Sequence, residues 1–169
     1  MNGFLAKLLD RFRRDEHGAI MVEMTIITPM LLTLAAGVFE FGNLIEKKLL
    51  IEAGLRDAAR YVARCNQSFS GVDCSAVAKN IAATATTDGT GIVRVSGWAA
   101  TSVTVQPTYL TVPVTVDGSG NQNYRSSTAN VYTVRVSTSF TYTGTSLLSY
   151  LGLGPITLSG AQEERYIGW

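Results

Sequence analysis

The hydrophobic pattern separates an apolar stretch near the beginning of the chain from a later region of alternating positions. Residues 19–45 are apolar almost throughout, and no charge occurs between Glu23 and Glu40. A membrane-spanning helix needs about 20 predominantly apolar residues, so the pattern predicts a transmembrane span over about residues 22–45. Two alternatives are a buried core helix and a secretory signal peptide, but Glu23 and Pro29 are unusual in a signal peptide.

The helical pattern continues beyond the apolar stretch. Four apolar residues recur at spacings of four and three, namely Ile51, Leu55, Ala58 and Val62. This period places them on one helix face, which we expect to face the folded domain while the apolar half faces partners. An unbroken helix over 19–64 would be about 69 Å long. Pro29 lacks a backbone donor, which predicts a kink or a loosened turn.

Alternating apolar and polar residues predict β-strands in the second half of the chain. The alternating segments are 92–95, 102–105, 109–116 and 130–136, with Phe140 and Tyr142 as an extension of the last. Pro113 predicts an edge strand or a bulge, and a hairpin is expected around 117–128. The fold class is therefore α+β, with a long N-terminal helix as the spine and a C-terminal antiparallel sheet of three to five strands.

The two cysteines lie close together, with turn-forming residues between Cys65 and Cys74. Such a pair is readable as a disulfide loop, which would contribute about 2.5–3 kcal/mol; two free buried thiols are the alternative. Disulfides persist in oxidising compartments, so a bridge would place everything after the span outside the cytoplasm. Ser75 is expected to cap a short helix that ends at about Ala85.

Composition and charge narrow the function. The chain has 14 Lys+Arg, 13 Asp+Glu and one His, and its formal net charge of +1 gives no bulk electrostatic case for nucleic acid. One histidine and two cysteines do not suffice for a usual four-ligand zinc site. Residues 117–123 space oxygen-bearing side chains as calcium loops do, but Asp117 is the single charged ligand, so a hairpin turn is expected there. Neither a cofactor nor a metal is predicted.

A glycine and a glutamate mark the boundary between the charged leader and the apolar stretch. The boundary reads Arg-Arg-Asp-Glu-His-Gly-Ala-Ile-Met-Val-Glu-Met over residues 13–24. This arrangement resembles the class III leader of type IV pilins, and more narrowly the TadE-like minor pilins, or pseudopilins, of the tight-adherence (Tad, type IVc) pilus. Similar segments follow at Thr28–Leu32, Gly37–Gly42 and Ala58–Tyr61, so the resemblance covers about residues 12–64. Pilins usually have an aromatic after the glutamate; Met24 stands there instead, which favours a minor, nonfilament role.

The resemblance implies three parts: a leader over 1–18, a transmembrane and extended helix over 19–64, and an extracytoplasmic domain over 65–169. It implies cleavage between Gly18 and Ala19 by a prepilin peptidase on the cytoplasmic face. The protein would cross the bacterial inner membrane once, with its N-terminus cytoplasmic and its C-terminal domain periplasmic, and would stay there or enter the pilus.

The resemblance also implies partners and a role. The partners would be the prepilin peptidase, other Tad pilins and pseudopilins, and the inner-membrane pilus assembly platform. Glu23 can accept a hydrogen bond from the new amine of Ala19 in its own or a neighbouring subunit, which lowers the free energy needed to bury both charges. The chain would be a structural protein in pilus assembly, initiation or capping, and no enzyme, since cleavage removes His17. The alternative is an uncleaved, membrane-anchored binding or adhesion protein.

Overall fold

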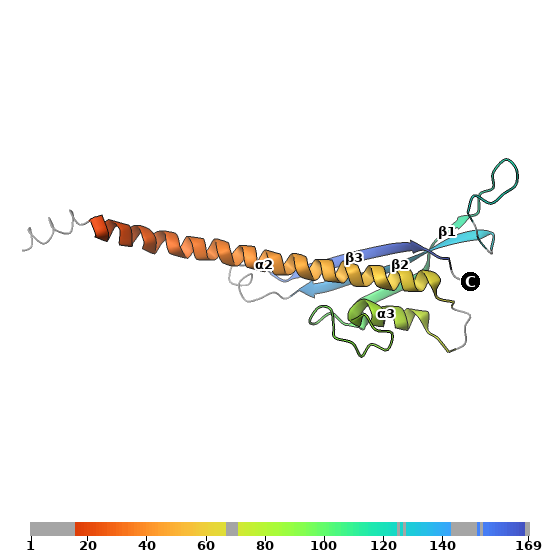
Figure 1. Ribbon diagram of the computed structural model, residues 1–169, viewed down its shortest axis with the longest axis horizontal. Coiled ribbons are helices and arrows are strands. Elements are labelled where there is room, and N and C mark those ends of the chain that lie inside the picture. The colour runs from red at the N-terminus through yellow and green to blue at the C-terminus, as the bar shows by residue number, and fades with distance from the viewer. Residues whose placement is uncertain are drawn as a thin grey trace, which may run out of the picture.

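The chain folds around one long helix, as a computed structural model shows (Figure 1). The structure describes residues 16–66, 71–124, 126, 128–142, 152 and 154–167. Its elements are the helices α2 (Glu16–Arg64) and α3 (Cys74–Thr84), the short 3-10 helix η1 (Ala100–Ser102), and the strands β1 (Val103–Pro113), β2 (Asn130–Tyr142) and β3 (Ile156–Arg165). The predicted α+β fold with a helical spine is confirmed. Most of the expected leader, 1–18, lies outside the described residues.

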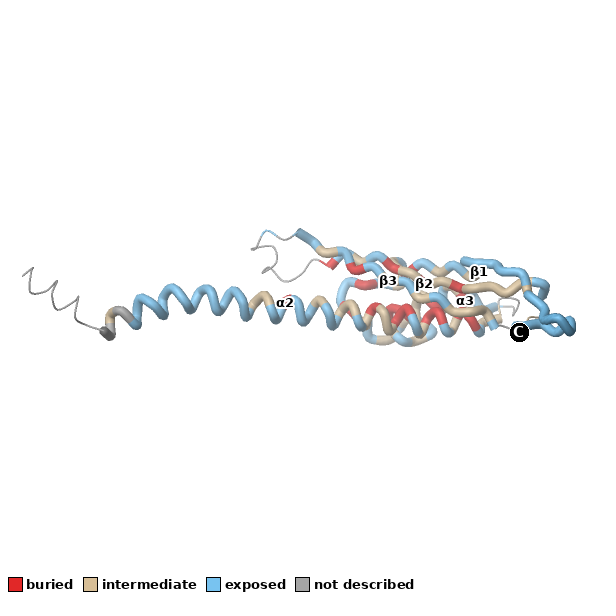
Figure 2. The backbone as a smooth tube through the Cα atoms, turned by 90° about the horizontal axis from the view of Figure 1, so that it is seen from above, coloured by how far each residue is buried: buried red, intermediate tan, exposed pale blue. Residues whose placement is uncertain are grey.

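Helix α2 has 49 residues and continues through Pro29 without a break. Two threonines near the proline bond within the helix, since the Thr25 hydroxyl donates to the carbonyl of Met21 at 2.7 Å and that of Thr33 to the carbonyl of Pro29 at 2.8 Å. Such bonds satisfy the hydroxyls without water. The first half of α2 extends away from the folded domain, and the second half forms one side of it (Figures 1 and 2). A kink at Pro29 stays a prediction.

The three strands form an antiparallel meander in the order β1-β2-β3. The two expected strands 102–105 and 109–116 are one strand, β1, whose register against β2 shifts between Gln106 and Leu110. Pro113 ends this edge strand, as its missing backbone donor predicts. β2 and β3 pair without a shift from Thr133–Arg165 to Tyr142–Ile156.

The expected strand over 92–95 is wrong. The amide of Arg94 donates to the carbonyl of Ala83 at 2.8 Å, and the Arg94 guanidinium donates to Asp57 on α2 at 2.6 Å. Because these bonds join the segment to α3 and α2, it pairs with no described strand, and Val95 is buried as part of a loop. Asp57 therefore pairs across the fold.

The core lies between the second half of α2, α3 and the sheet. All four residues of the predicted stripe are fully buried, which confirms that this face of α2 packs on the domain. Their neighbours in the core come from α3, from the three strands and from the loop before η1: Ala78, Ala82, Val95, Trp98, Val103, Val134, Val136 and Leu158. Full burial of a large apolar side chain such as these stabilises the fold by about 1.5–3 kcal/mol.

One glycine allows α2 and α3 to approach closely. A Cβ atom on Gly54 would lie 2.4 Å from the carbonyl oxygen of Ala82 and 3.0 Å from the ring of Trp98. Trp98 is 1% exposed, and its Nε1 donates to the Thr138 hydroxyl at 3.1 Å, which in turn donates to the carbonyl of Ser102 at 2.7 Å. The buried indole is therefore both packed and hydrogen-bonded.

Candidate functional site

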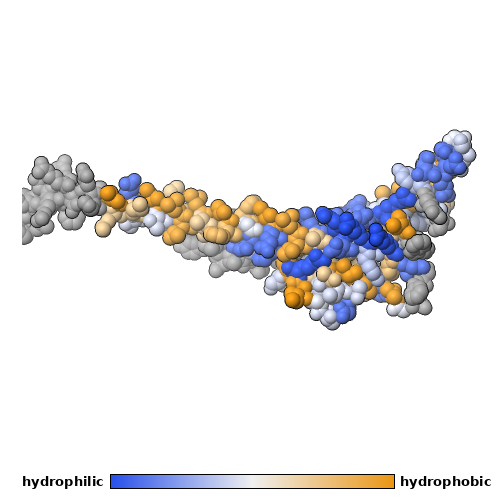
Figure 3. All heavy atoms as spheres, in the orientation of Figure 1, coloured by the Kyte–Doolittle hydropathy of each residue, from blue (hydrophilic) through white to orange (hydrophobic). Residues whose placement is uncertain are grey.

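The first half of α2 exposes apolar side chains on all sides. Ile20 to Phe39 has no buried residue among those with described side chains, and large residues such as Met21, Ile26 and Val38 are 70–73% exposed. Figure 3 shows this half as a hydrophobic rod beside the more polar sheet. Among the described residues, one helix is long and apolar enough to cross a membrane, and it is this one. Exposed apolar surface on this scale indicates lipid or protein contact.

The residues of the predicted cleavage site lie at the very beginning of α2. Gly18 is in the first turn, and a Cβ atom added there would meet nothing within 4 Å. Gly18 is helical in the structure, whereas a protease cleft binds an extended backbone, so cleavage here would require this turn to unwind.

Glu23 is exposed on α2, four residues after Ala19. Positions i and i+4 share one helix face, so a carboxylate at 23 and an amine at 19 would lie one turn apart after cleavage. The described residues provide no hydrogen bond or ion pair for Glu23, which leaves its carboxylate open to a group from outside the fold.

A polar cluster marks the position at which the sheet meets the apolar half of α2. Glu40 is 3% exposed and is the first buried residue along the described part of the helix. The hydroxyl of Tyr142, at the end of β2, donates to Glu40 Oε1 at 3.2 Å. Lys47 Nζ donates to the same hydroxyl at 3.2 Å and lies 4.3 Å from the centroid of the ring. From Ile20 to Phe39 the helix is about 30 Å long, which matches the hydrocarbon thickness of a bilayer.

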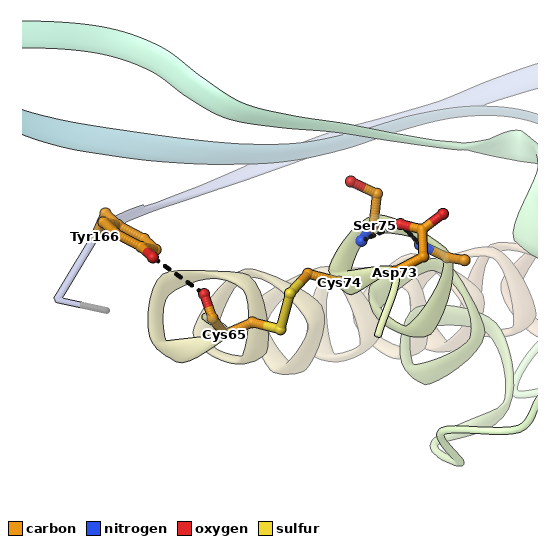
Figure 4. The surroundings of a disulfide bond; sticks show 6 residues. Cys65, Asp73, Cys74, Ser75 and Tyr166 are labelled. Carbon is orange, nitrogen blue, oxygen red and sulfur yellow. Dashed lines mark hydrogen bonds between the residues drawn. A yellow bond between two sulfur atoms is a disulfide. The ribbon is translucent and has the colours of Figure 1, made fainter. Parts of the chain in front are cut away.

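The disulfide joins the end of α2 to the beginning of α3 (Figure 4). Cys65 and Cys74 are bridged with a Cα–Cα distance of 6.0 Å, which confirms the predicted pair. The Tyr166 hydroxyl donates to the carbonyl of Cys65 at 3.1 Å, so the segment after β3 also meets this corner. Asp73, and not Ser75, caps α3: its carboxylate accepts from the amides of Ser75 and Ala76.

The oxygen-rich loop after β1 bonds to itself. The Asp117 carboxylate accepts from the backbone amide of Asn121 at 2.8 Å, from the side-chain amide of Asn121 at 3.2 Å and from the amide of Ser119 at 2.9 Å. In that order of effect, these donors lower the pKa of Asp117 below its ordinary value. The residues that the structure describes include no group of three or more His, Cys, Asp or Glu side chains that could hold a metal ion. The loop therefore forms the turn that the sequence predicts at 117–123.

Several residues that define this arrangement have no individual signal in the sequence. Tyr142 reads only as an extension of a strand, and its contact with Glu40 joins residues 102 positions apart. Arg94 reads as part of a strand rather than as a partner of Asp57. Glu40 is the exception, because a carboxylate at the end of an apolar run suggests a buried partner or an interface.

The fold and the exposed helix together define a pilin-like protein, with a long N-terminal helix that is half bare and half covered by a small antiparallel sheet. Residues 18–60 match the family model described as TadE-like protein, so this helical segment is similar to the TadE-like family. The match begins at Gly18 and excludes the sheet. Neither the curated proteins nor the solved structures give a match. This similarity supports a pilin-like protein associated with the Tad pilus.

Proposed function

We propose that the chain is a minor pilin, or pseudopilin, that a prepilin peptidase cuts between Gly18 and Ala19 and that then contributes to assembly, initiation or capping of a Tad pilus. The observation that carries the proposal is the continuity of α2, whose exposed apolar half and domain-forming half are one helix. A subunit built in this way can leave the bilayer for a helical bundle without refolding its domain. Its partners would be other Tad pilins and pseudopilins and the inner-membrane assembly platform.

The proposed placement in the bacterial inner membrane rests on the polar cluster and the disulfide. The apolar helix before Glu40 has the length of a bilayer core, so Glu40, Tyr142 and Lys47 would lie at its outer face. Beyond them, the bridge between Cys65 and Cys74 favours an oxidising compartment. The N-terminus would then be cytoplasmic and the β domain periplasmic. This placement shortens the expected span of about 22–45 at its outer end.

Glu23 would act after cleavage. The new ammonium at Ala19 and the carboxylate at Glu23 lie one turn apart on α2 and would enter an apolar bundle together. A charge buried without a partner is strongly unfavourable, whereas a paired and hydrogen-bonded one is tolerated. We therefore assign Glu23 the role of partner to an N-terminal amine, in the same subunit or in the next one.

Gly18 offers a clean test of processing. Since a Cβ atom there meets nothing within the fold, Gly18→Phe changes what the peptidase meets and leaves the contacts of the protein intact. Amino-terminal sequencing of the membrane-extracted parent is expected to begin at Ala19, and that of Gly18→Phe at Met1. Gly18→Ala is the matched control and should still be cut. A parent that begins at Met1 would contradict the proposal and favour an uncleaved, membrane-anchored binding or adhesion protein.

A further inference from the structure

Three arginines form a line on the outer half of α2. Arg56, Arg60 and Arg64 are exposed and follow one another at intervals of four residues; we call them the arginine row. This spacing puts them on one helix face, away from the stripe that is buried against the sheet. The same face continues toward the membrane through two exposed apolar residues, Ile45 and Leu49, which are 43% and 59% exposed.

The described residues leave the arginine row largely without anionic partners. Arg56 and Arg64 have no hydrogen bond or ion pair with the described residues. Arg60 Nε lies 3.8 Å from a carboxylate oxygen of Glu164, and both side chains are largely exposed, at 60% and 41%. Exposed ion pairs of this kind contribute little to the free energy of folding, so Arg60 keeps most of its capacity to bind another anion.

The acidic residues nearest to the row along α2 already have partners. Glu52, one turn before Arg56, lies 3.1 Å from Lys48 Nζ. Asp57 is engaged by Arg94 at 2.6 Å. Among the described residues, these two carboxylates therefore do not neutralise the row, and its positive charge can attract an anionic group of another subunit.

A shallow pocket lies at the far end of the row. Its volume is about 270 Å³, and Arg60, Tyr61, Arg64 and Cys65 line it. Two guanidinium groups one turn apart can hold a carboxylate between them, because the planar fork of arginine matches carboxylate geometry. The tyrosine ring and the disulfide corner supply an apolar wall for the stem of an acidic side chain.

We propose that the arginine row docks carboxylate side chains of a neighbouring pilin-like subunit, an inference that rests on the function proposed above. The row continues the apolar face that neighbouring helices would cover, so one partner can contact both. Lipid headgroups do not reach it, since Arg56 lies about 24 Å along the helix beyond Glu40, while screening limits charge interactions to about 8 Å.

Photocrosslinking in native membranes tests the assignment. A photoreactive benzoylphenylalanine replaces Leu49, which is exposed on the face of the row, and a second reporter replaces Phe39 in the apolar half. Arg56→Glu and Arg60→Glu, alone and together, are combined with each reporter. Lys79→Glu on α3 is the matched control, because it reverses a charge elsewhere on the domain. Mass spectrometry identifies the captured partner.

We expect the parent to capture a pilin-like subunit at both reporters. The double arginine variant should reduce capture at position 49 by about fivefold or more, with Lys79→Glu unchanged. Capture at 49 that survives in the double variant, or that yields lipid, an unrelated protein or nothing, would overturn the inference. If the reporter at position 39 still captures pilin-like subunits in those cases, the proposed function stands and only the inference about the arginine row fails. If neither reporter captures a pilin-like subunit, both the inference and the proposed function fail.

Discussion

Gly54 shows how strongly the packing of two helices depends on a single hydrogen atom. Replacing it with Ala puts a Cβ atom 2.4 Å from a backbone oxygen of α3, so one helix has to move. We expect Gly54→Ala to lower the free energy of unfolding by about 1–3 kcal/mol, although alanine is the better helix former by about 1 kcal/mol. Denaturant unfolding of the detergent-solubilised protein, followed by circular dichroism, measures the change.

Gly42 is the matched control for that experiment. It lies on the same helix, and a Cβ atom added to it meets nothing within 4 Å. Gly42→Ala should therefore be neutral or stabilising by up to about 1 kcal/mol. Equal effects of the two substitutions would show that the close approach at Gly54 is unimportant.

Asp117 gives the loop after β1 a pH dependence of known sign. Donors from Asn121 and Ser119 lower the pKa of its carboxyl below the ordinary 3.8. A lowered pKa means that the loop bonds are fully present above the ordinary value and are lost as the pH falls through the lowered one. We expect the carboxyl carbon of Asp117 to titrate below pH 3.8 in an NMR titration. In Asp117→Asn, the amide shifts of Ser119 and Asn121 should not change over that range, and titration at or above 3.8 in the parent would contradict the interpretation.

At the scale of elements, the disulfide joins α3 to the end of α2 that lies farthest from the apolar half of that helix. Replacing Cys65 and Cys74 with alanine together opens a loop of about ten residues, and the lost restriction on the unfolded chain predicts a destabilisation of about 2.5–3 kcal/mol. Thermal unfolding measures it. Reductant should lower the melting temperature of the parent to that of the variant and leave the variant unchanged. A variant as stable as the oxidised parent would show that the bridge is dispensable.

Sequence patterns predict those helices and strands whose structure is decided by their own side chains. The stripe at Ile51, Leu55, Ala58 and Val62 predicts its burial because a helix of fixed period can cover only one face. In the same way, the alternation of apolar and polar residues predicts β1 and β2. The missing backbone N–H of Pro113 predicts that β1 is an edge strand.

β3 could not be predicted on the same grounds. Gly160 interrupts its apolar pattern and its last residues are polar, so its pairing with β2 decides its structure. The partners of its charges come from elsewhere: Glu163 lies 3.6 Å from Arg135 on β2, and Glu164 lies near Arg60 on α2. The contact between Glu40 and Tyr142 could not be predicted for the same reason, since no local pattern specifies which distant tyrosine will reach a carboxylate.

At the scale of the whole molecule, the two halves of α2 depend on different surroundings. The outer half is covered by the sheet and α3 of its own chain, whereas the half before Glu40 is bare (Figure 2). The bare half buries its apolar surface only in a bilayer or among other helices. Folding of the domain and assembly of the subunit are therefore separable, and a change in the bare half should alter assembly without unfolding the domain.

Glu23 is the residue at which this separation can be tested. Glu23→Ala removes an exposed carboxylate that forms no hydrogen bond or ion pair with the described residues, so membrane level and cleavage should persist. In a bundle, however, the amine of Ala19 would lose its partner, and an unpaired buried charge costs about 3–5 kcal/mol, or less near the interface. Capture of pilin-like neighbours by a reporter at Phe39 should fall by about a hundredfold or more if the charge is fully buried, and by less near the interface. Glu23→Gln should be intermediate because it accepts a hydrogen bond but carries no charge. An alanine variant that is cleaved, accumulates and crosslinks like the parent would leave Glu23 as an ordinary interfacial residue.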